Sequence, residues 1–164
     1  MSRASLRLLL CAFWACAAAV AHTAEVRFQP AAPGLYAFIG EKSGRTYDNE
    51  GLNANIGLLV TPAGALLIDS GASFKGAQQI HAAVKKVTDQ PVKWVLNTGG
   101  QDHRWLGNGY FAAQGAEVIA HANAKADMQA RGGDHIASLK NELKEKLDGT
   151  VPTLPTRWLG GNDE

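Results

Sequence analysis

"NIGLLVTPAGALLIDSGAS" (residues 55–73) is the stretch that decides the fold. Two apolar runs are separated by residues 61–64, Thr-Pro-Ala-Gly, where proline presets one backbone angle and glycine permits a chain reversal. This pattern predicts a hairpin of buried strands. Ser73 then stands where a helix cap is expected, and apolar residues at helical spacing predict a helix over residues 74–89.

The pattern continues on the C-terminal side of this helix. Pro91 ends the helix, and "VKWVLNT" (92–98) returns to the alternation of a β-strand. A strand, a helix and a strand within about 30 residues make a βαβ unit, which pairs its strands in parallel. "GYFAAQG" (109–115) predicts a helical turn, and "AEVIAHA" (116–122) predicts a further parallel strand. The sequence therefore predicts an α/β fold.

The flanking segments are less regular. "GLYAFIGE" (34–41) predicts a short strand, followed by a polar loop over residues 41–53. "NAKADMQARGG" (123–133) predicts a helix that its two glycines stop, and residues 135–148 predict a separate amphipathic surface helix. Residues 149–164 lack periodicity and are interpreted as a loop that would lead to another strand.

The first 21 residues have the order of a secretory signal peptide. Arg3 and Arg7 precede an apolar run over residues 8–20, and small residues surround a predicted cleavage point after Ala21. The run is shorter than the roughly 18 to 20 residues of a membrane span. We therefore expect an exported, secreted or periplasmic protein, free of the membrane after cleavage, with one domain over residues 25–164.

Composition and charge exclude several classes. The chain has 164 residues, 46% hydrophobic and 19% charged, which suits one globular core. Cys11 and Cys16 both lie in the predicted signal peptide, so the mature chain has no disulfide, cysteine nucleophile or thiolate metal site. Removing Arg3 and Arg7 from a net charge of +1 leaves −1, which predicts no nucleic-acid partner. No serine elbow, P-loop or dinucleotide fingerprint follows a strand.

Polar residues follow the predicted parallel strands where ligands usually bind. Asp69 and His121 each end a predicted strand, and Gln101, Asp102 and His103 follow the strand that ends at residue 98. Because parallel strands end at one edge of a sheet, these groups are expected to converge there. Carboxylate and imidazole suit zinc or iron, and either group can act as a general base.

Each of these residues also has a plainer interpretation. Asp102 could cap a turn while His103 and Arg104 face solvent or the carboxylate. Asp69 could tie down neighbouring backbone N–H groups in an Asx-turn, and His121 could be a supporting partner or a strand-end histidine with a local hydrogen bond. His135 falls on a predicted helix without ligand-like neighbours. Spacing alone leaves these alternatives open.

Together with the helix between them, "NIGLLVTPAGALLIDSGAS", "VKWVLNTGGQDHRWLGNGYF" (92–111) and "AEVIAHANAKADM" (116–128) resemble the N-terminal half of the metallo-β-lactamase superfamily. The resemblance covers roughly residues 35–131. It implies an αββα sandwich, here truncated to its first half, and one or two metal ions, usually zinc, that activate water for hydrolysis. Asp69 matches an aspartate whose role in the family is chiefly structural.

The metal-binding loop departs from the family pattern N-T-H-x-H-x-D-H-x-x-G-N. Without gaps, Gly99 and Gln101 replace the first two histidines, His103 the aspartate and Arg104 the last histidine. An alignment on Asp102-His103 keeps that pair but needs a one-residue shift, which leaves Thr98 and Gly100 at the histidine positions. Either alignment depletes the first metal position. The resemblance places the remaining ligands in a second half that these 164 residues do not contain.

These observations give a leading hypothesis and two rivals. The leading one is an exported zinc-dependent hydrolase domain, most similar to quinoprotein relay system zinc metallohydrolases, with Asp102 as catalytic residue, Asp102, His103 and Gln101 as metal ligands, and a small-molecule substrate. Asp69 and His121 would support them. The rivals are a metal-free binding or structural module and an inactive fragment. Half a sandwich exposes an apolar face, so we expect a need for a C-terminal half or an oligomeric partner.

Overall fold

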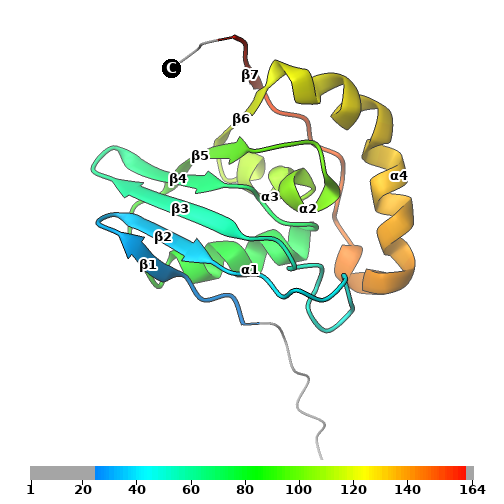
Figure 1. Ribbon diagram of the computed structural model, residues 1–164, viewed down its shortest axis with the longest axis horizontal. Helices are drawn as coiled ribbons and strands as arrows, with labels where there is room; N and C mark the ends of the chain where they lie inside the picture. The colour runs from blue at the N-terminus through cyan, green and yellow to red at the C-terminus, as the bar shows by residue number, and fades with distance from the viewer. Residues whose placement is uncertain (1–24, 162–164) are drawn as a thin grey trace, which may run out of the picture.

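The computed structural model describes residues 25–161, which form a seven-stranded mixed sheet and the helices packed against it (Figure 1). The strands lie side by side in chain order: β1 (Gln29–Ala32), β2 (Leu35–Phe38), β3 (Ile56–Thr61), β4 (Gly64–Ile68), β5 (Val92–Asn97), β6 (Glu117–His121) and β7 (Arg157–Leu159). The first four pair antiparallel, and β4 to β7 pair in parallel. The predicted α/β class is confirmed. The predicted signal peptide lies outside the described residues.

The hairpin at residues 55–73 has the predicted form. β3 and β4 pair from Thr61↔Gly64 at the turn to Gly57↔Ile68 at the open end. The Thr61 hydroxyl donates to the Gly64 carbonyl oxygen at 2.8 Å and fastens the turn. Leu58 and Leu67 sit opposite each other and are fully buried. The hairpin thus supplies the centre of the sheet and of the core.

The helices are α1 (Phe74–Val84), α2 (Asp102–Trp105), α3 (Asn108–Ala113) and α4 (Lys125–Leu143), with short 3₁₀ turns η1 (Ala122–Ala124) and η2 (Lys144–Leu147). The predicted cap of α1 is confirmed, because the Ser73 hydroxyl accepts from the Gly76 N–H at 2.9 Å. The helix ends at Val84, earlier than the predicted 89. The N–H groups of Val87 and Thr88 both turn back onto the Val84 carbonyl, which closes the helix.

The prediction that glycines divide the region after residue 123 is wrong. α4 runs unbroken through Gly132 and Gly133 to Leu143. A Cβ on Gly132 would lie 2.9 Å from Pro152 and 3.1 Å from the Trp105 ring. Glycine is therefore used here for close packing of α4 against its neighbours, and the buried contact outweighs the low helix propensity of glycine.

Three short elements fall where the sequence predicts none. β1 and β7 lie at the two edges of the sheet, and α2 lies inside the predicted polar loop. β7 pairs in parallel with β6 within residues 149–164, so the strand expected beyond this loop lies inside the segment. Strands of three or four residues are too short to establish an alternation in the sequence.

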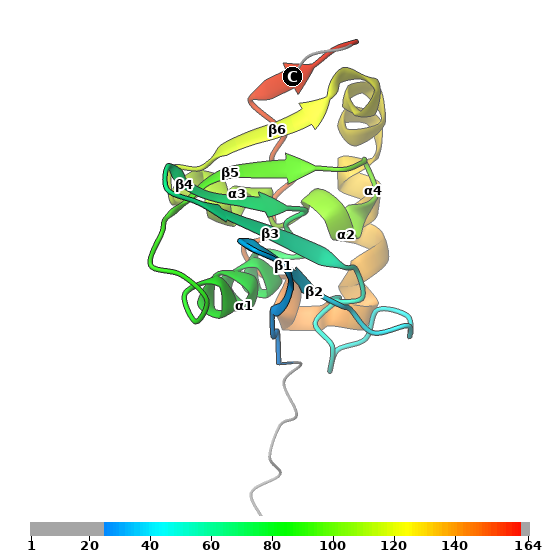
Figure 2. The ribbon, with the colours of Figure 1, turned by 60° about the vertical axis from the view of Figure 1, so that its left-hand side comes forward.

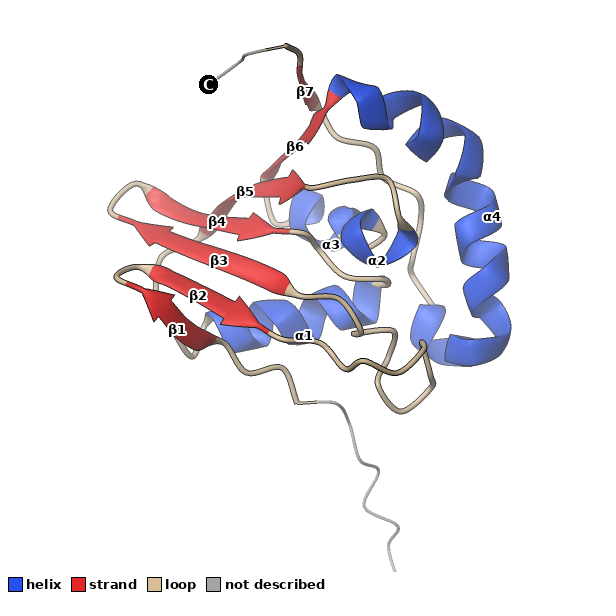
Figure 3. Cartoon of the chain, viewed as in Figure 1, coloured by secondary structure: helices blue, strands red, loops and turns tan. Residues whose placement is uncertain are grey.

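One face of the sheet is covered by helices and the other is not (Figures 2 and 3). The covered face packs Leu58, Leu67, Val95 and Val118 with side chains of α1 and α3 in the main core. The opposite face carries apolar positions in register that belong to neither core cluster, and no described helix lies over them. These positions are Leu35, Ala37, Gly57, Leu59, Leu66, Ile68, Trp94, Leu96 and Ile119, here called the open face.

The open face predicts association of the isolated chain, because parallel strands are rarely left with an uncovered apolar face. Leu66 lies in the row Leu59–Leu66–Trp94 at its centre. Leu66→Glu should lower hydrophobic-dye binding and self-association, while the free energy of unfolding changes by less than about 1 kcal/mol. Ala130→Glu, on the exposed side of α4, adds the same charge and should change neither. Equal association in both variants would contradict a role for this face.

Candidate functional site

Two buried amides hold the edge at which β4 and β5 end. Asn97, the last residue of β5, and Asn108, the first of α3, exchange side-chain hydrogen bonds of 3.0 and 2.8 Å. The Ser70 hydroxyl donates to Asn108 Oδ1 at 2.8 Å, and Asn108 Nδ2 reaches the Thr153 carbonyl at 3.0 Å. Asn108 is fully buried. Four separate segments are therefore fixed to one another at this point.

The same point requires a close backbone approach. A Cβ on Gly107 would collide with the Ser70 carbonyl oxygen, and the Gly107 N–H donates to the Gly71 carbonyl at 3.1 Å. The Arg104 carbonyl in turn accepts from Asn97 Nδ2 at 2.9 Å and from the Ser70 N–H at 2.9 Å. These bonds set the position of α2, the short helix that carries the predicted site residues.

Asp102 begins α2 and its carboxylate is engaged on several sides. Its Oδ1 accepts from the His103 N–H at 2.7 Å and forms an ion pair with Arg45. His103 Nδ1 lies 3.1 Å from the same oxygen. Burial alone would raise the pKa of Asp102, but the hydrogen bonds from His103 and the charge of Arg45 outweigh it and hold the pKa below its usual value. The carboxylate is therefore stabilised as an anion.

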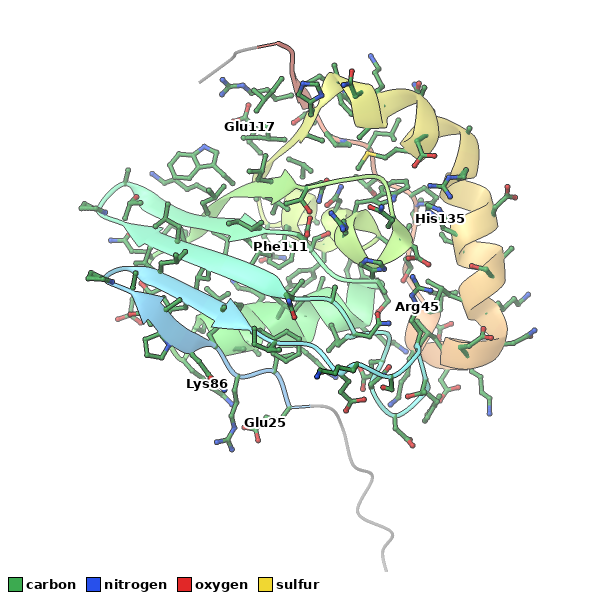
Figure 4. The ribbon with its side chains drawn as sticks, in the orientation of Figure 1. Glu25, Arg45, Lys86, Phe111, Glu117 and His135 are labelled. Atoms are coloured by element: carbon green, nitrogen blue, oxygen red, sulfur yellow. The ribbon has the colours of Figure 1, made fainter. Side chains whose placement is uncertain are left out.

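Arg45 is the residue at this site that sequence reasoning missed. It comes from the polar loop between β2 and β3 and also places Nη2 2.9 Å from His103 Nδ1. Figure 4 shows Arg45 and His135 on the side of the molecule where α4 lies. A single arginine within a polar loop has no periodicity or motif that would single it out, so only the fold reveals its partner.

Asp69 bonds to the next strand of the sheet. Its oxygens accept from the Thr98 N–H at 2.8 Å and from the Thr98 hydroxyl at 2.7 Å, so it links β4 to β5 rather than forming a local Asx-turn. Its φ of +65° places it in the left-handed region. Burial raises the pKa of Asp69 above its usual value, against the Thr98 hydrogen bonds and the charge of Arg104. Arg104 reaches the same Thr98 hydroxyl at 2.8 Å.

A third carboxylate at this edge, Asp127, also faces an arginine. Asp127 on α4 pairs with Arg131 through two hydrogen bonds of 2.6 Å, which lower its pKa. A Cβ on Gly100 would collide with the Asp127 carboxylate, so this pair lies against the loop after β5. Asp102, Asp69 and Asp127 are thus each faced by an arginine, directly or through one hydroxyl.

The other predicted residues lie apart from this cluster of contacts. Gln101 precedes α2, is exposed and forms no side-chain cap. His121 is exposed, and its Nδ1 accepts from the Asn123 N–H at 3.1 Å, which caps η1. This contact is the local one that its plainer interpretation describes. The structure brings Asp102 and His103 together and gives Gln101 and His121 no part in their hydrogen bonds.

His135 is buried beside the site, although it has no ligand-like neighbours in the sequence. Its ring lies 6.1 Å from that of Trp105, whose Nε1 donates to the Gly100 carbonyl at 3.0 Å. His135 Nδ1 is buried without a hydrogen-bond partner. Burial lowers the pKa of His135, while the charge of Asp102 acts in the opposite direction. Burial thus disfavours the charged form of the ring at this position.

The residues at this edge do not fit a zinc ion. A zinc centre needs three or four protein ligands, and residues 25–161 contain no group of three His, Cys, Asp or Glu side chains placed to hold one. Gly99 and Gly100 have no side chains, and a guanidinium faces both Asp102 and His103. Since a guanidinium can only donate, Asp102 Oδ1 already accepts from a fixed cation and would have to give it up to bind a metal.

Comparison with known proteins supports the fold. No family model and no curated protein matches the chain by sequence. Among solved structures, the mono-zinc form of metallo-β-lactamase FIM-1 from Pseudomonas aeruginosa is 16% identical, with a TM-score of 0.56 over 84% of this chain and 52% of that one. A metallo-β-lactamase from Hirschia baltica is 16% identical, with a TM-score of 0.58 over 82% of this chain and 52% of that one. A metallo-β-lactamase from Pontibacter korlensis is 17% identical, with a TM-score of 0.53 over 82% of this chain and 52% of that one.

The chain therefore has the fold of the N-terminal half of a metallo-β-lactamase, as the sequence resemblance implied. It spans about half the length of these solved structures. At this low sequence identity the structural similarity establishes only the fold, and the subfamily expected from the sequence stays a prediction.

Asn108→Ala should loosen this edge. The change leaves Asn97 Oδ1 without its partner and removes one of the partners of Asn97 Nδ2 and of the Ser70 hydroxyl, and a buried polar group left unpaired costs about 1 to 3 kcal/mol. We expect a loss of about 2 to 4 kcal/mol in the free energy of unfolding, measured with urea. Asn123→Ala, at an exposed position, should cost less than about 0.5 kcal/mol. Equal losses in both variants would show that the amide pair does not hold the edge.

Proposed function

We propose that this chain is a metallo-β-lactamase-fold module that works without zinc and serves to bind a partner. The carrying observation is the position of Arg45, whose guanidinium faces both the acid and the imidazole that the sequence offers as metal ligands. The amides that position α2 bond to each other, whereas one of the first two histidine positions of the family loop is a glycine in either alignment, Gly99 or Gly100. The edge is therefore built for internal ion pairs.

The open face is the surface that we propose for the partner. Its nine apolar positions span β2 to β6 and stay partly exposed in the described residues. The proposed occupant is a second sheet layer formed by further polypeptide of the same fold, because the similar solved structures are about twice as long as this chain. A second copy of the chain is the other outcome that the Leu66→Glu variant would reveal.

Export is part of the proposal. It rests on the charged, apolar and small-residue order of residues 1–21. Within the described residues, no helix combines the length and the hydropathy that crossing a bilayer requires. The net charge of −1 expected after cleavage supports neither a nucleic acid nor an anionic membrane as partner.

One observation favours the zinc-dependent hydrolase as a second candidate. Asp102 Oδ1 and His103 Nδ1, on consecutive residues, lie 3.1 Å apart, and this pair of groups of ligand type supports the second candidate. In that case Asp102 and His103 would both have to release Arg45 to hold zinc. Gln101 would be the further candidate ligand, and the substrate would be a small molecule. Zinc would then supply an activated water for hydrolysis.

Zinc binding separates the two functions. We expect the purified chain, dialysed against zinc and analysed for metal, to retain far less than one ion per chain, because the edge offers too few ligands. Asp102→Ala and His103→Ala should then match the wild type, as should Asp89→Ala, a control at an exposed position. One tightly held ion in the wild type and Asp89→Ala, lost in the other two variants, would establish the hydrolase instead.

A further inference from the structure

We propose that Arg45 is the resident cation of this edge and that it keeps zinc out by occupying the point between Asp102 and His103. The inference rests on the proposed function and names the residue that enforces it. It also makes a positive claim: an imidazole at position 45 would complete a metal site that the wild-type chain lacks.

Convergence on one atom is the first support. Arg45 Nη2 is within hydrogen-bond reach of both Asp102 Oδ1 and His103 Nδ1. These two atoms point at the same cationic nitrogen from adjacent residues of α2, and the Asp102 side chain is only 9% exposed. A carboxylate held this far from water needs a positive partner, so the guanidinium fills a position that the site requires to be cationic.

The loop that carries Arg45 is anchored by other residues. Asn49 is buried, and its Oδ1 accepts from the Thr46 N–H at 2.9 Å and the Gly51 N–H at 3.0 Å. Glu50 binds Lys146 at 3.1 Å and Gln79 at 2.5 Å. These contacts hold the polar loop against α1 and η2 without using Arg45. A substitution at position 45 can therefore change the cation while the loop stays in place.

Arg45 itself is incompletely satisfied, which separates it from an ordinary structural arginine. Its Nε is buried without a hydrogen-bond partner, and the contacts with Asp102 and His103 both use Nη2. A guanidinium has five N–H donors, and a purely structural role would be expected to use more of them. The site therefore uses the positive charge of Arg45 at Nη2 more than the several donors of its planar guanidinium.

Arg45→His tests the inference, with Arg45→Ala beside it. Arg45→His would place a third ligand type next to Asp102 and His103. We expect about one zinc ion per chain by equilibrium dialysis, with affinity at least about tenfold above the wild type, and a zinc-dependent rise in Tm. Adding His103→Ala to Arg45→His should abolish both. Arg27→His, which alters an exposed pair with Glu25, is the matched control and should bind no zinc.

The outcomes separate the two proposals. If Arg45→His and Arg45→Ala both fold, as urea unfolding would report, and neither binds zinc more tightly than the wild type, Arg45 does not exclude the metal and this inference is wrong. The proposed function would stand in that case. If the wild type itself holds zinc through Asp102 and His103, the proposed function fails first, and the inference fails with it.

Discussion

Two buried amides, Asn97 and Asn108, are the constraint on which this edge of the molecule depends. Each satisfies the other, and together they reach the loop after β4, the backbone of α2 and the segment before β7. A buried polar group without a partner costs free energy, and the side-chain amides of Asn97 and Asn108 have partners for their donors and acceptors, so the network resists rearrangement. These bonds hold α2 at the edge where β4 and β5 end, whatever its own side chains are.

The charged side chains at this edge are arranged in pairs of opposite sign. Three carboxylates lie there, and an arginine faces each of them, directly for Asp102 and Asp127 and through the Thr98 hydroxyl for Asp69. A metal ion would have to displace these internal cations, and in either alignment one of the first two histidine positions of the family loop falls on a glycine, Gly99 or Gly100. The fold of the N-terminal half of a metallo-β-lactamase thus carries an edge at which each of these carboxylates already has a cationic partner, and a fold alone does not specify chemistry.

The central strands and α1 could be predicted from the sequence, whereas tertiary contacts such as those of Gly132 and Arg45 could not. The hairpin, α1 and the parallel strands β5 and β6 follow from long apolar patterns, because burial decides them. Gly132 was misread as a stop, since its packing against Trp105 and Pro152 depends on a tertiary contact that propensity does not contain. Strand topology predicted that Asp69, the loop with Asp102 and His103, and His121 lie at one edge, but Arg45 lies 57 residues from Asp102 and no local pattern joins them.

The central claim is that the Arg45 charge stabilises Asp102, which a double-mutant cycle with Arg45→Met and Asp102→Asn measures most directly. The lowered pKa of Asp102 means that its contribution is present above its unfolded pKa, about 3.9, and is lost as the pH falls through the folded value. The account predicts a coupling of about 1 to 3 kcal/mol at pH 7 that fades in acid. Additivity within about 0.5 kcal/mol at pH 7, or a coupling unchanged once Asp102 is protonated, would contradict it.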